Sequence, residues 1–208
     1  RKVNGARGSS VAKNNSVRRF INIEPLFNVI YQRAVALVVR KALSKQGNDL
    51  HDGQTIHREL IRSSVYSTLD LRNASDSNIF VAAEALLHTG CPELWAAVRT
   101  GRSYTTILTY PNGHVEEHVN CKLSSMGNGY TFEIMTLILL SQARVVDTRS
   151  RVYGDDIIIR SEYAEAYAKH LELTGWCINP SKTFINSSFR ESCGGFYHDG
   201  RGYLTSYD

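Results

Sequence analysis

Residues 151–160 read Arg-Val-Tyr-Gly-Asp-Asp-Ile-Ile-Ile-Arg, with a short apolar run on each side of Gly154-Asp155-Asp156. Gly and Asp are common turn residues, and the β-branched and aromatic residues beside them are typical of strands. The stretch therefore predicts a very tight hairpin. Because its flanks are apolar, we expect a buried strand pair whose connection carries two carboxylates.

The segments around this hairpin extend it into a larger unit. Residues 65–71 predict a short strand that ends at Asp70, and residues 75–89 predict a helix. With residues 90–129 left out, the order from Val65 is strand, helix, strand, strand, helix, strand. This is the split βαβ arrangement of an α+β fold, in which the first two strands run parallel with the third between them.

This topology places acidic residues together. Parallel strands end at the same edge of a sheet, so Asp70 is expected beside the turn that carries Asp155 and Asp156, with Lys182 at the same edge. Clustered carboxylates repel one another unless cations lie between them, and oxygen ligands favour Mg²⁺ or Mn²⁺. Gly-Asp-Asp alone would predict no more than a turn. With Asp70 at the same edge, a metal-dependent phosphoryl-transfer site is the better interpretation.

Other elements are predicted from periodicity and turn signals. Apolar residues of a helix over 24–46 share one side, namely Leu26, Ile30, Ala34, Leu37 and Val38. Further helices are expected over 92–99, 130–146 and 162–174. Strands at 104–110 and 114–120 flank Pro111-Asn112-Gly113, and a further strand is expected over 182–186.

Composition and charge bound the class of protein. The chain has 208 residues, of which 42% are hydrophobic and 21% charged, which is an ordinary globular composition. No apolar stretch reaches the roughly 20 residues of a membrane helix, and the four separated cysteines favour a reducing compartment. The net charge is +4, but residues 1–23 hold six bases and no acid. Either a solvated tail or an arm for RNA or a triphosphate fits that run.

Five blocks, in order along the chain, resemble the RNA-dependent RNA polymerases, and among them the replicases of positive-strand RNA bacteriophages (the Qβ-like, levivirus family). The first block combines Lys13-Asn14-Asn15, Arg18-Arg19 and Ile23-Glu24-Pro25. The others are 70–77 (Asp-Leu-Arg-Asn-Ala-Ser-Asp-Ser), 124–133 (Ser-Ser-Met-Gly-Asn-Gly-Tyr-Thr-Phe-Glu), Tyr153-Gly154-Asp155-Asp156, and 189–194 (Phe-Arg-Glu-Ser-Cys-Gly).

The resemblance implies a right-hand polymerase palm, a split βαβ antiparallel sheet with helices on one face, together with part of the fingers. It implies fingers at 1–65, palm at 66–89, a fingers insertion at 90–124 and palm again at 125–208. The chain does not begin with Met, and no segment resembles a thumb domain or the family's amino-terminal region. We therefore expect a fragment of a larger enzyme.

The resemblance also implies roles for single residues. Asp70 and Asp155 would hold two Mg²⁺ ions (Mn²⁺ could substitute), with Asp156 as a weaker or outer ligand. Lys182 would donate a proton to pyrophosphate, although a solvated lysine fits the position equally well. Residues 189–197 would form the hairpin that grips the growing strand. Seven residues would bind the nucleoside triphosphate: Lys13, Arg18 and Arg19 at its phosphates, Asp76 and Asn128 at its ribose 2′-hydroxyl, and Ser125 and Gly127 along its bound position.

The function implied is RNA-directed RNA synthesis that replicates a phage genome, with RNA template, nascent strand and nucleoside triphosphates as partners. Relatives also recruit host translation elongation factors and a ribosomal protein, and work in the cytoplasm of an infected bacterium without a membrane. Two alternatives stay open. A reverse transcriptase also uses a Tyr-x-Asp-Asp turn, and a non-catalytic RNA-binding relic would keep the fold without the activity.

Overall fold

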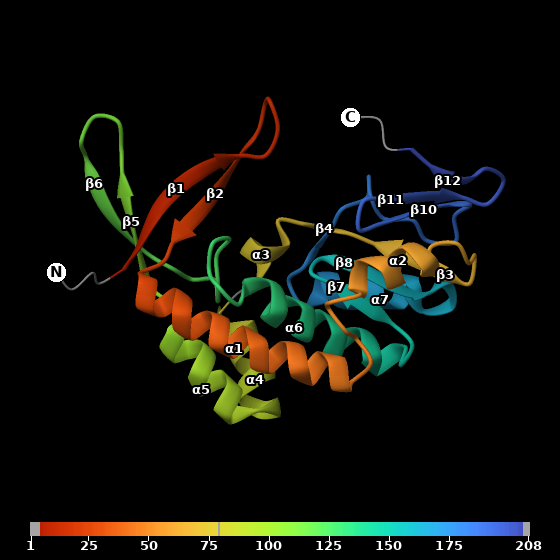
Figure 1. Cartoon of the computed structure of the whole chain (residues 1–208), viewed down its shortest axis with the longest axis horizontal. Helices are drawn as coiled ribbons and strands as arrows, with labels where there is room; N and C mark the ends of the chain where they lie inside the picture. The colour runs from red at the N-terminus through yellow and green to blue at the C-terminus, as the bar shows by residue number, and fades with distance from the viewer. Residues whose placement is uncertain (1–4, 79, 206–208) are drawn as a thin grey trace. The chain divides into compact units, whose positions relative to one another are not determined.

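The computed structural model describes residues 5–78 and 80–205 (Figure 1). Their contacts divide the chain into two compact units. Unit 1 comprises Arg1–Val38 and Asn78–Phe132, and unit 2 comprises Val39–Ser77 and Glu133–Asp208. These limits differ from the predicted segment boundaries, because residues 39–65 lie in unit 2 and residues 78–89 lie in unit 1. Arg1 and Lys2 of the basic run lie outside the described residues.

The predicted split βαβ sheet forms the centre of unit 2. Its strands are β3 (Tyr66–Leu69), β7 (Arg151–Tyr153) and β8 (Asp156–Arg160), in the order β3-β8-β7. Both neighbours of β8 run antiparallel to it, so β3 and β7 are parallel to each other, as predicted. Residues 157–159 of β8 are completely buried, which explains why three consecutive isoleucines follow the turn.

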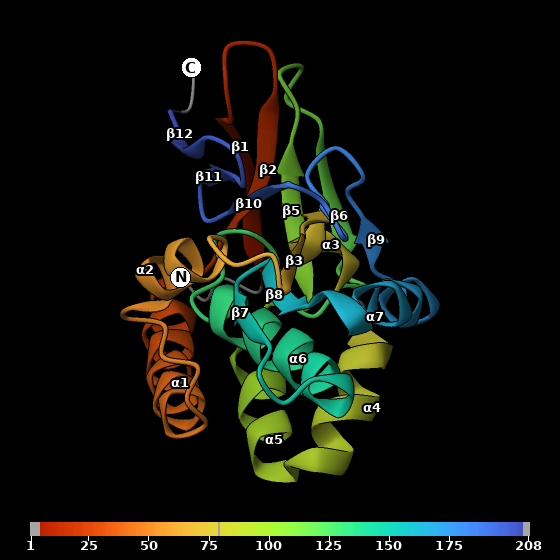
Figure 2. The same cartoon turned by 90° about the vertical axis from the view of Figure 1, so that its right-hand side faces the viewer.

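Helices of unit 2 pack against this sheet (Figure 2). Helix α7 (Ser161–Leu173) contacts β3 and β8. The hydroxyl of its buried Tyr167 donates a hydrogen bond to the carbonyl of Leu139, in α6 (Thr131–Val146). Helix α2 (Gly53–Leu60), which the sequence analysis did not predict, contacts β7 and also β10 (Phe189–Ser192).

The predicted strand over 182–186 is wrong. Within this stretch Phe184 exchanges two backbone hydrogen bonds with Thr68 as an isolated antiparallel bridge. Asn179 and Thr183, just before and within this stretch, form hydrogen bonds with Asp70 instead.

Two further sets of short strands lie in unit 2. Strand β4 (Leu71–Arg72) pairs with β9 (Cys177–Ile178), and β10, β11 (Gly195–His198) and β12 (Gly202–Leu204) form a separate sheet.

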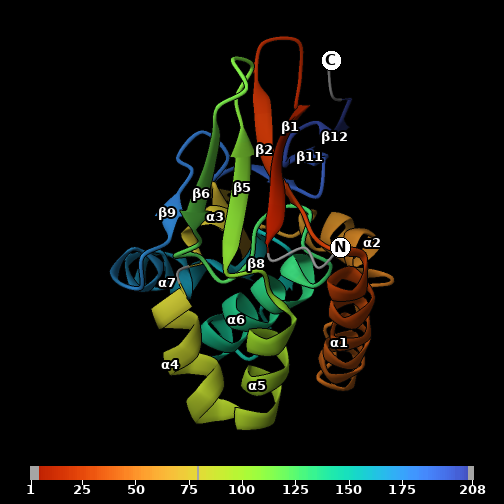
Figure 3. The same cartoon turned by 90° about the vertical axis from the view of Figure 1, so that its left-hand side faces the viewer.

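Unit 1 contains a four-stranded sheet in the order β2-β1-β5-β6 (Figure 3). Its strands are β1 (Ala6–Ala12), β2 (Arg18–Ile23), β5 (Thr105–Thr109) and β6 (Val115–Val119). The hairpin of β5 and β6 was predicted from its Pro-Asn-Gly turn, where Gly113 has a positive φ of 81°. The hairpin of β1 and β2 was not predicted. Helices α4 (Phe80–Gly90) and α5 (Pro92–Gly101) pack against each other in the same unit.

Helix α1 (Leu26–Lys45) confirms the predicted helix but not its buried face. Leu26, Ile30 and Leu37 are 71%, 57% and 61% exposed, whereas Gln32 is completely buried. The amide of Gln32 donates to the carbonyl of Gly101 and accepts from the backbone N–H of Gly129. A polar side chain whose donor and acceptor both have partners can be buried at little cost. Helix α1 therefore buries the side that carries Gln32, and the apolar side identified from the sequence is mostly exposed.

No helix in the described part of the chain is both long enough and apolar enough to cross a membrane.

Candidate active site

Three carboxylates gather at one end of the unit 2 sheet. Leu69 pairs with Ile157 at the end of the β3–β8 ladder, so the next residues, Asp70 and Asp156, follow side by side. Tyr153 pairs with Asp156 across the turn, where Gly154 takes a φ of 65° that favours glycine. Asp155 occupies the second turn position. Residues 85 positions apart therefore share one edge, as the topology predicted.

Burial and mutual repulsion raise the pKa of two of these carboxylates. The pKa of Asp156 is raised to about 6, first by burial and further by the charges of Asp155 and Asp70. A hydrogen bond from the backbone N–H of Cys193 opposes that rise. The pKa of Asp70 is also raised, first by burial, with Asp155 adding to the rise and Asn179 opposing it. The site therefore accumulates more negative charge than its surroundings neutralise.

Asp70 is held by the segment that follows β9. The side-chain amide of Asn179 donates to its carboxylate at 2.6 Å, and the Asn179 backbone N–H donates to its carbonyl at 2.9 Å. Thr183 accepts from the Asp70 backbone N–H at 3.2 Å. Neither Asn179 nor Thr183 was predicted as a site residue from the sequence. The contacts span 109 and 113 positions, and no local pattern signals them.

Asp156 is held by the hairpin of β10 and β11. Cys193 and Gly194 form its turn, with φ values of 51° and 68°, and the Cys193 backbone N–H points to the Asp156 carboxylate. Residues 189–197 were predicted to grip the growing strand. In the structure this hairpin contacts the Gly-Asp-Asp turn through Cys193, a contact that was not predicted from the sequence. The grip on the growing strand stays a prediction.

The turn itself rests on three further contacts. The hydroxyl of Thr136 accepts from the backbone N–H of Gly154 at 3.0 Å. The ring of buried His57 meets the ring of Tyr153 edge-on, with 6.2 Å between centroids. A Cβ added to Gly53 would collide with the same tyrosine ring, so α2 can approach the turn only with glycine there.

Lys182 lies at this edge and is paired. Its ammonium forms an ion pair with Glu191 at 3.0 Å, and its side chain is 52% exposed. That hydrogen bond raises the lysine pKa above its ordinary value, and the charges of Asp70 and Asp156 add to the rise. The structure thus gives Lys182 a position beside the carboxylates and a protonated state at neutral pH.

The remaining predicted site residues are divided between the units. Asp76 lies exposed in the short helix α3 (Ala74–Ser77) of unit 2. Ser125, Gly127 and Asn128 belong to the loop before α6 in unit 1. Asn22 attaches this loop to β2, because its amide donates to Ser125 at 2.8 Å and its backbone N–H donates to the Met126 carbonyl.

Gly127 is required in that loop. Its φ is 97°, and a Cβ added there would collide with the backbone oxygen of Asn22. Ser125 and Asn128 are both buried, at 4% and 8% exposure, whereas Gly127 is exposed. The loop therefore presents its backbone at Gly127 and keeps its polar side chains in fixed hydrogen bonds.

The basic run is a β-hairpin rather than an unstructured tail. Lys13 lies in its turn, where its backbone N–H donates to the Val17 carbonyl at 2.8 Å. Arg18 and Arg19 begin β2, and all three basic side chains are exposed. Arg18 donates to the hydroxyl and carbonyl of Ser10 across the hairpin. Because the run forms an ordered hairpin, a ligand-binding arm is favoured over a solvated tail.

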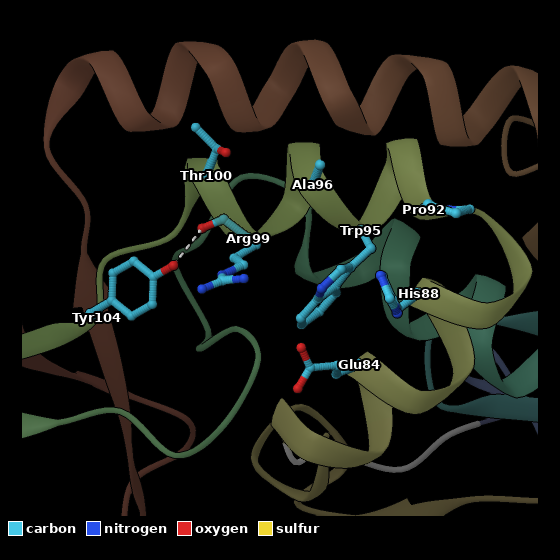
Figure 4. A pocket seen from close by; sticks show the side chains of 8 residues that line it. All are labelled: Glu84, His88, Pro92, Trp95, Ala96, Arg99, Thr100 and Tyr104. Carbon is cyan, nitrogen blue, oxygen red and sulfur yellow. Dashed lines mark hydrogen bonds between the residues drawn. The ribbon is translucent and has the colours of Figure 1, made fainter.

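A separate pocket of about 590 Å³ lies in unit 1 between α4 and α5 (Figure 4). The edge of the pocket includes Tyr104, whose hydroxyl donates to the Arg99 carbonyl at 3.3 Å. None of the predicted site residues is among the residues that line it: Glu84, His88, Pro92, Trp95, Ala96, Arg99, Thr100 and Tyr104.

The donor chemistry at the unit 2 edge fits a hard divalent cation. The carboxylates of Asp70, Asp155 and Asp156 offer only oxygen ligands, and their negative charges repel one another. Within residues 5–78 and 80–205, however, no three His, Cys, Asp or Glu side chains are grouped closely enough to hold a metal ion. The fit is therefore one of ligand type and charge, not of a formed coordination geometry.

Solved structures of template-directed polymerases share this fold. The RNA-dependent RNA polymerase of BmCPV in its elongation state matches with a TM-score of 0.67 at 10% identity, over 94% of this chain and 21% of that one. The apo telomerase of Candida tropicalis gives 0.64 at 13% identity, over 94% and 46%. The RNA-dependent RNA polymerase of a human picobirnavirus gives 0.57 at 14% identity, over 94% and 43%. The fold is therefore that of the right-hand polymerases, with palm and fingers, as predicted.

Sequence comparison identifies the family within this class. The family described as RNA replicase, beta-chain, matches residues 1–207, so the chain belongs to it. It is 37% identical to the RNA-directed RNA polymerase subunit beta of Escherichia virus Qbeta, over 92% of this chain and 33% of the relative. It is 32% identical to the RNA-directed RNA polymerase beta chain of Escherichia phage MS2, over 92% and 35%. The chain spans about a third of the length of these relatives.

Proposed function

We propose that the chain supplies the catalytic centre of an RNA-directed RNA polymerase that copies a phage RNA genome. The observation that carries the proposal is the placement of Asp70, Asp155 and Asp156 at one edge of a polymerase sheet. It occurs in a chain of the RNA replicase beta-chain family. Because the chain is about a third of its relatives' length, the proposal concerns the larger enzyme that contains it.

The reaction proposed is nucleotidyl transfer. The 3′-hydroxyl of the nascent strand attacks the α-phosphorus of a nucleoside triphosphate, a new phosphodiester bond forms, and pyrophosphate leaves. Asp70 and Asp155 would hold two divalent cations, with Asp156 beside them. When bound, such cations lower the pKa of the attacking hydroxyl and neutralise charge on the leaving oxygens.

The chain's own residues position and protonate the reactants. Asn179 and Cys193 hold the carboxylates of Asp70 and Asp156 in place by hydrogen bonds. Lys182 is protonated beside them and would give its proton to the departing pyrophosphate. Its ion pair with Glu191 keeps the ammonium at this edge of the sheet.

Substrate recognition is assigned to unit 1 and to Asp76. Lys13, Arg18 and Arg19 would bind the triphosphate from the β1–β2 hairpin, since guanidinium groups bind phosphate oxygens in a bidentate manner. Asn128 and Asp76 would bind the ribose 2′-hydroxyl, and the Ser125–Gly127 loop would line the nucleotide. The proposed partners are an RNA template, host translation elongation factors and a ribosomal protein, and the proposed location is the bacterial cytoplasm. The family resemblance alone suggests them.

The test is nucleotide incorporation by the full-length replicase carrying Asp155→Asn. We expect incorporation to fall by at least about 10³-fold, because the amide keeps the shape of the carboxylate but loses the charge that holds a cation. Asp49→Asn is the matched control: Asp49 is a partly exposed carboxylate of the same unit that accepts a hydrogen bond from the Ser44 hydroxyl and lies outside the site. Its incorporation rate should stay within about twofold of wild type.

The competing function is a non-catalytic RNA-binding relic. It predicts no incorporation by the wild-type replicase at any Mg²⁺ or Mn²⁺ concentration and no thermal stabilisation by either ion. Undiminished synthesis by Asp155→Asn would instead refute the metal assignment.

A further inference from the structure

Glu24 is a buried carboxylate at the junction of β2 and α1, and it is 8% exposed. Three neutral donors converge on it. The hydroxyl of Ser103 donates to Oε2 at 2.5 Å, and the amide of Asn28 donates to the same oxygen at 3.4 Å. The amide of Asn128 donates to the other oxygen, Oε1, at 3.3 Å. All of these residues belong to unit 1.

The contact with Glu24 determines which way the Asn128 amide faces. A carboxylate can only accept, so Asn128 must present its Nδ2 group to Glu24. Its Oδ1 then accepts from the backbone N–H of Tyr130 at 3.3 Å, at the start of α6. Its second N–H faces the phenol oxygen of Tyr130, a contact that opposes the rise in the tyrosine pKa caused by burial. One lone pair of Oδ1 then remains for a further partner, in a fixed direction.

We propose that Glu24 is a positioning residue for sugar selection: it fixes the Asn128 amide so that its remaining acceptor lone pair meets the ribose 2′-hydroxyl of the incoming nucleotide. The inference rests on the proposed function, in which Asn128 binds that hydroxyl. A 2′-hydroxyl both donates and accepts hydrogen bonds, whereas a deoxyribose offers neither. An amide held in one orientation distinguishes the two sugars better than one free to rotate.

Ser103 and Asn28 extend this support. They occupy the second oxygen of Glu24, and the Asn28 amide also donates to the Ser103 hydroxyl. The carboxylate therefore cannot rotate away from Asn128 without leaving the hydroxyl proton of buried Ser103 without an acceptor. Glu24 never touches the nucleotide in this arrangement. Its effect should therefore appear in the discrimination between sugars and not in the chemical step.

The experiment compares kcat and KM of the full-length replicase for a nucleoside triphosphate and for its 2′-deoxy counterpart. We expect Glu24→Ala to lower the ratio of the two kcat/KM values by about tenfold, mainly through a higher KM for the ribonucleotide. Glu24→Gln should restore most of the ratio, because its amide oxygen still accepts from Asn128 and the Ser103 hydroxyl can accept from its NH₂ group.

Two variants control the experiment. Asn120→Ala removes a partly buried amide of the same unit, which bonds Thr106 and the Ser103 carbonyl but not Asn128. Its sugar ratio should stay at the wild-type value. Asn128→Ala should lower the ratio as Glu24→Ala does, and the double variant should lower it no further.

The outcomes separate this inference from the proposed function. If Asn128→Ala lowers the sugar ratio and Glu24→Ala leaves it unchanged, the inference is wrong and the proposed function stands. If Asn128→Ala leaves the ratio unchanged in an active replicase, Asn128 is not the sugar-binding residue, and the inference fails together with that assignment while the polymerase function stands. Should Glu24→Ala unfold below the assay temperature, Glu24→Asp replaces it. Its shorter side chain withdraws from Asn128, and the same drop is expected.

Discussion

At the scale of single residues, His57 shows how a buried side chain holds the Gly-Asp-Asp turn in place. Its side chain is 1% exposed, its Nδ1 lies 2.8 Å from the hydroxyl of Ser192, and its ring meets Tyr153. It thus joins α2, β10 and the residue before the Gly-Asp-Asp turn. Burial first, and then the charge of Arg151 on β7, lower its pKa to about 3.

This pKa predicts acid sensitivity of the fold. The unfolded histidine binds a proton near pH 6.5 and the folded one only near pH 3, so stability is full above pH 6.5 and falls as the pH drops. For His57 alone, the loss at pH 5 relative to pH 7 should be about 2 kcal/mol. The raised pKa of Asp156 acts in the opposite direction over this range, so the His57 contribution is the difference between wild type and variant. His57→Gln, which cannot take up a proton, should lose stability less steeply over this range.

Urea unfolding of the 208-residue chain at pH 7 and pH 5 measures this difference. His88→Gln is the matched control, since His88 is an exposed histidine, and it should keep the wild-type acid sensitivity. Equal pH dependence in wild type and His57→Gln would contradict the assignment.

At the scale of elements, the three-residue strand β7 depends on a side chain for its outer edge. One side of β7 pairs with β8. On the other side, Asn48 donates to the Val152 carbonyl at 2.9 Å and accepts from its N–H at 3.1 Å. Asn48 is 3% exposed, so it replaces a neighbouring strand for this one residue.

Removal of this amide should weaken the hairpin. Asn48→Ala leaves a buried N–H and C=O of Val152 unpaired, at a cost of about 2–4 kcal/mol in the free energy of unfolding. Asn48→Asp should also destabilise, because a carboxylate can accept from the N–H but cannot donate to the carbonyl. The control is Asn112→Ala, at an exposed turn position where the side chain accepts from His114.

Denaturant unfolding measures the change, and hydrogen exchange of the Val152 amide localises it. An Asn48→Ala chain as stable as wild type would show that the β7 edge needs no such partner.

The elements also show what sequence could predict. The hairpins at 105–119 and 151–160 and helix α6 were predicted because turn residues and apolar runs are local signals. The β1–β2 hairpin was not, because its residues are mostly exposed and lack strand alternation toward a core. The buried face of α1 was wrong because Gln32 is satisfied by Gly101 and Gly129, which are distant in the chain.

The site follows the same division. Asp70 could be placed beside Asp155 and Asp156 because the first two strands of a split βαβ unit are parallel and therefore end at the same edge of the sheet. The side chains that hold these carboxylates could not be predicted. Asn179 and Cys193 reach them through loops whose paths depend on packing, and neither residue type nor spacing indicates the contact.

At the scale of the whole molecule, fold and family support different parts of the conclusion. RNA polymerases and telomerase share this fold with TM-scores between 0.57 and 0.67, so the fold alone does not determine the sugar of the product. A foamy viral reverse transcriptase matches at 0.58 as well. The family match, and the polar residues Asp76 and Asn128 at the positions assigned to the ribose, favour ribonucleotides.

The most direct measurement is therefore primer extension by the full-length replicase on RNA and DNA templates, each with ribonucleotides and with deoxyribonucleotides. We expect the rate of synthesis on the RNA template with ribonucleotides to exceed the rate of every other combination by at least about 10²-fold. A preference for deoxyribonucleotides, or for the DNA template, would contradict the proposal that this chain supplies the catalytic centre of an RNA-directed RNA polymerase.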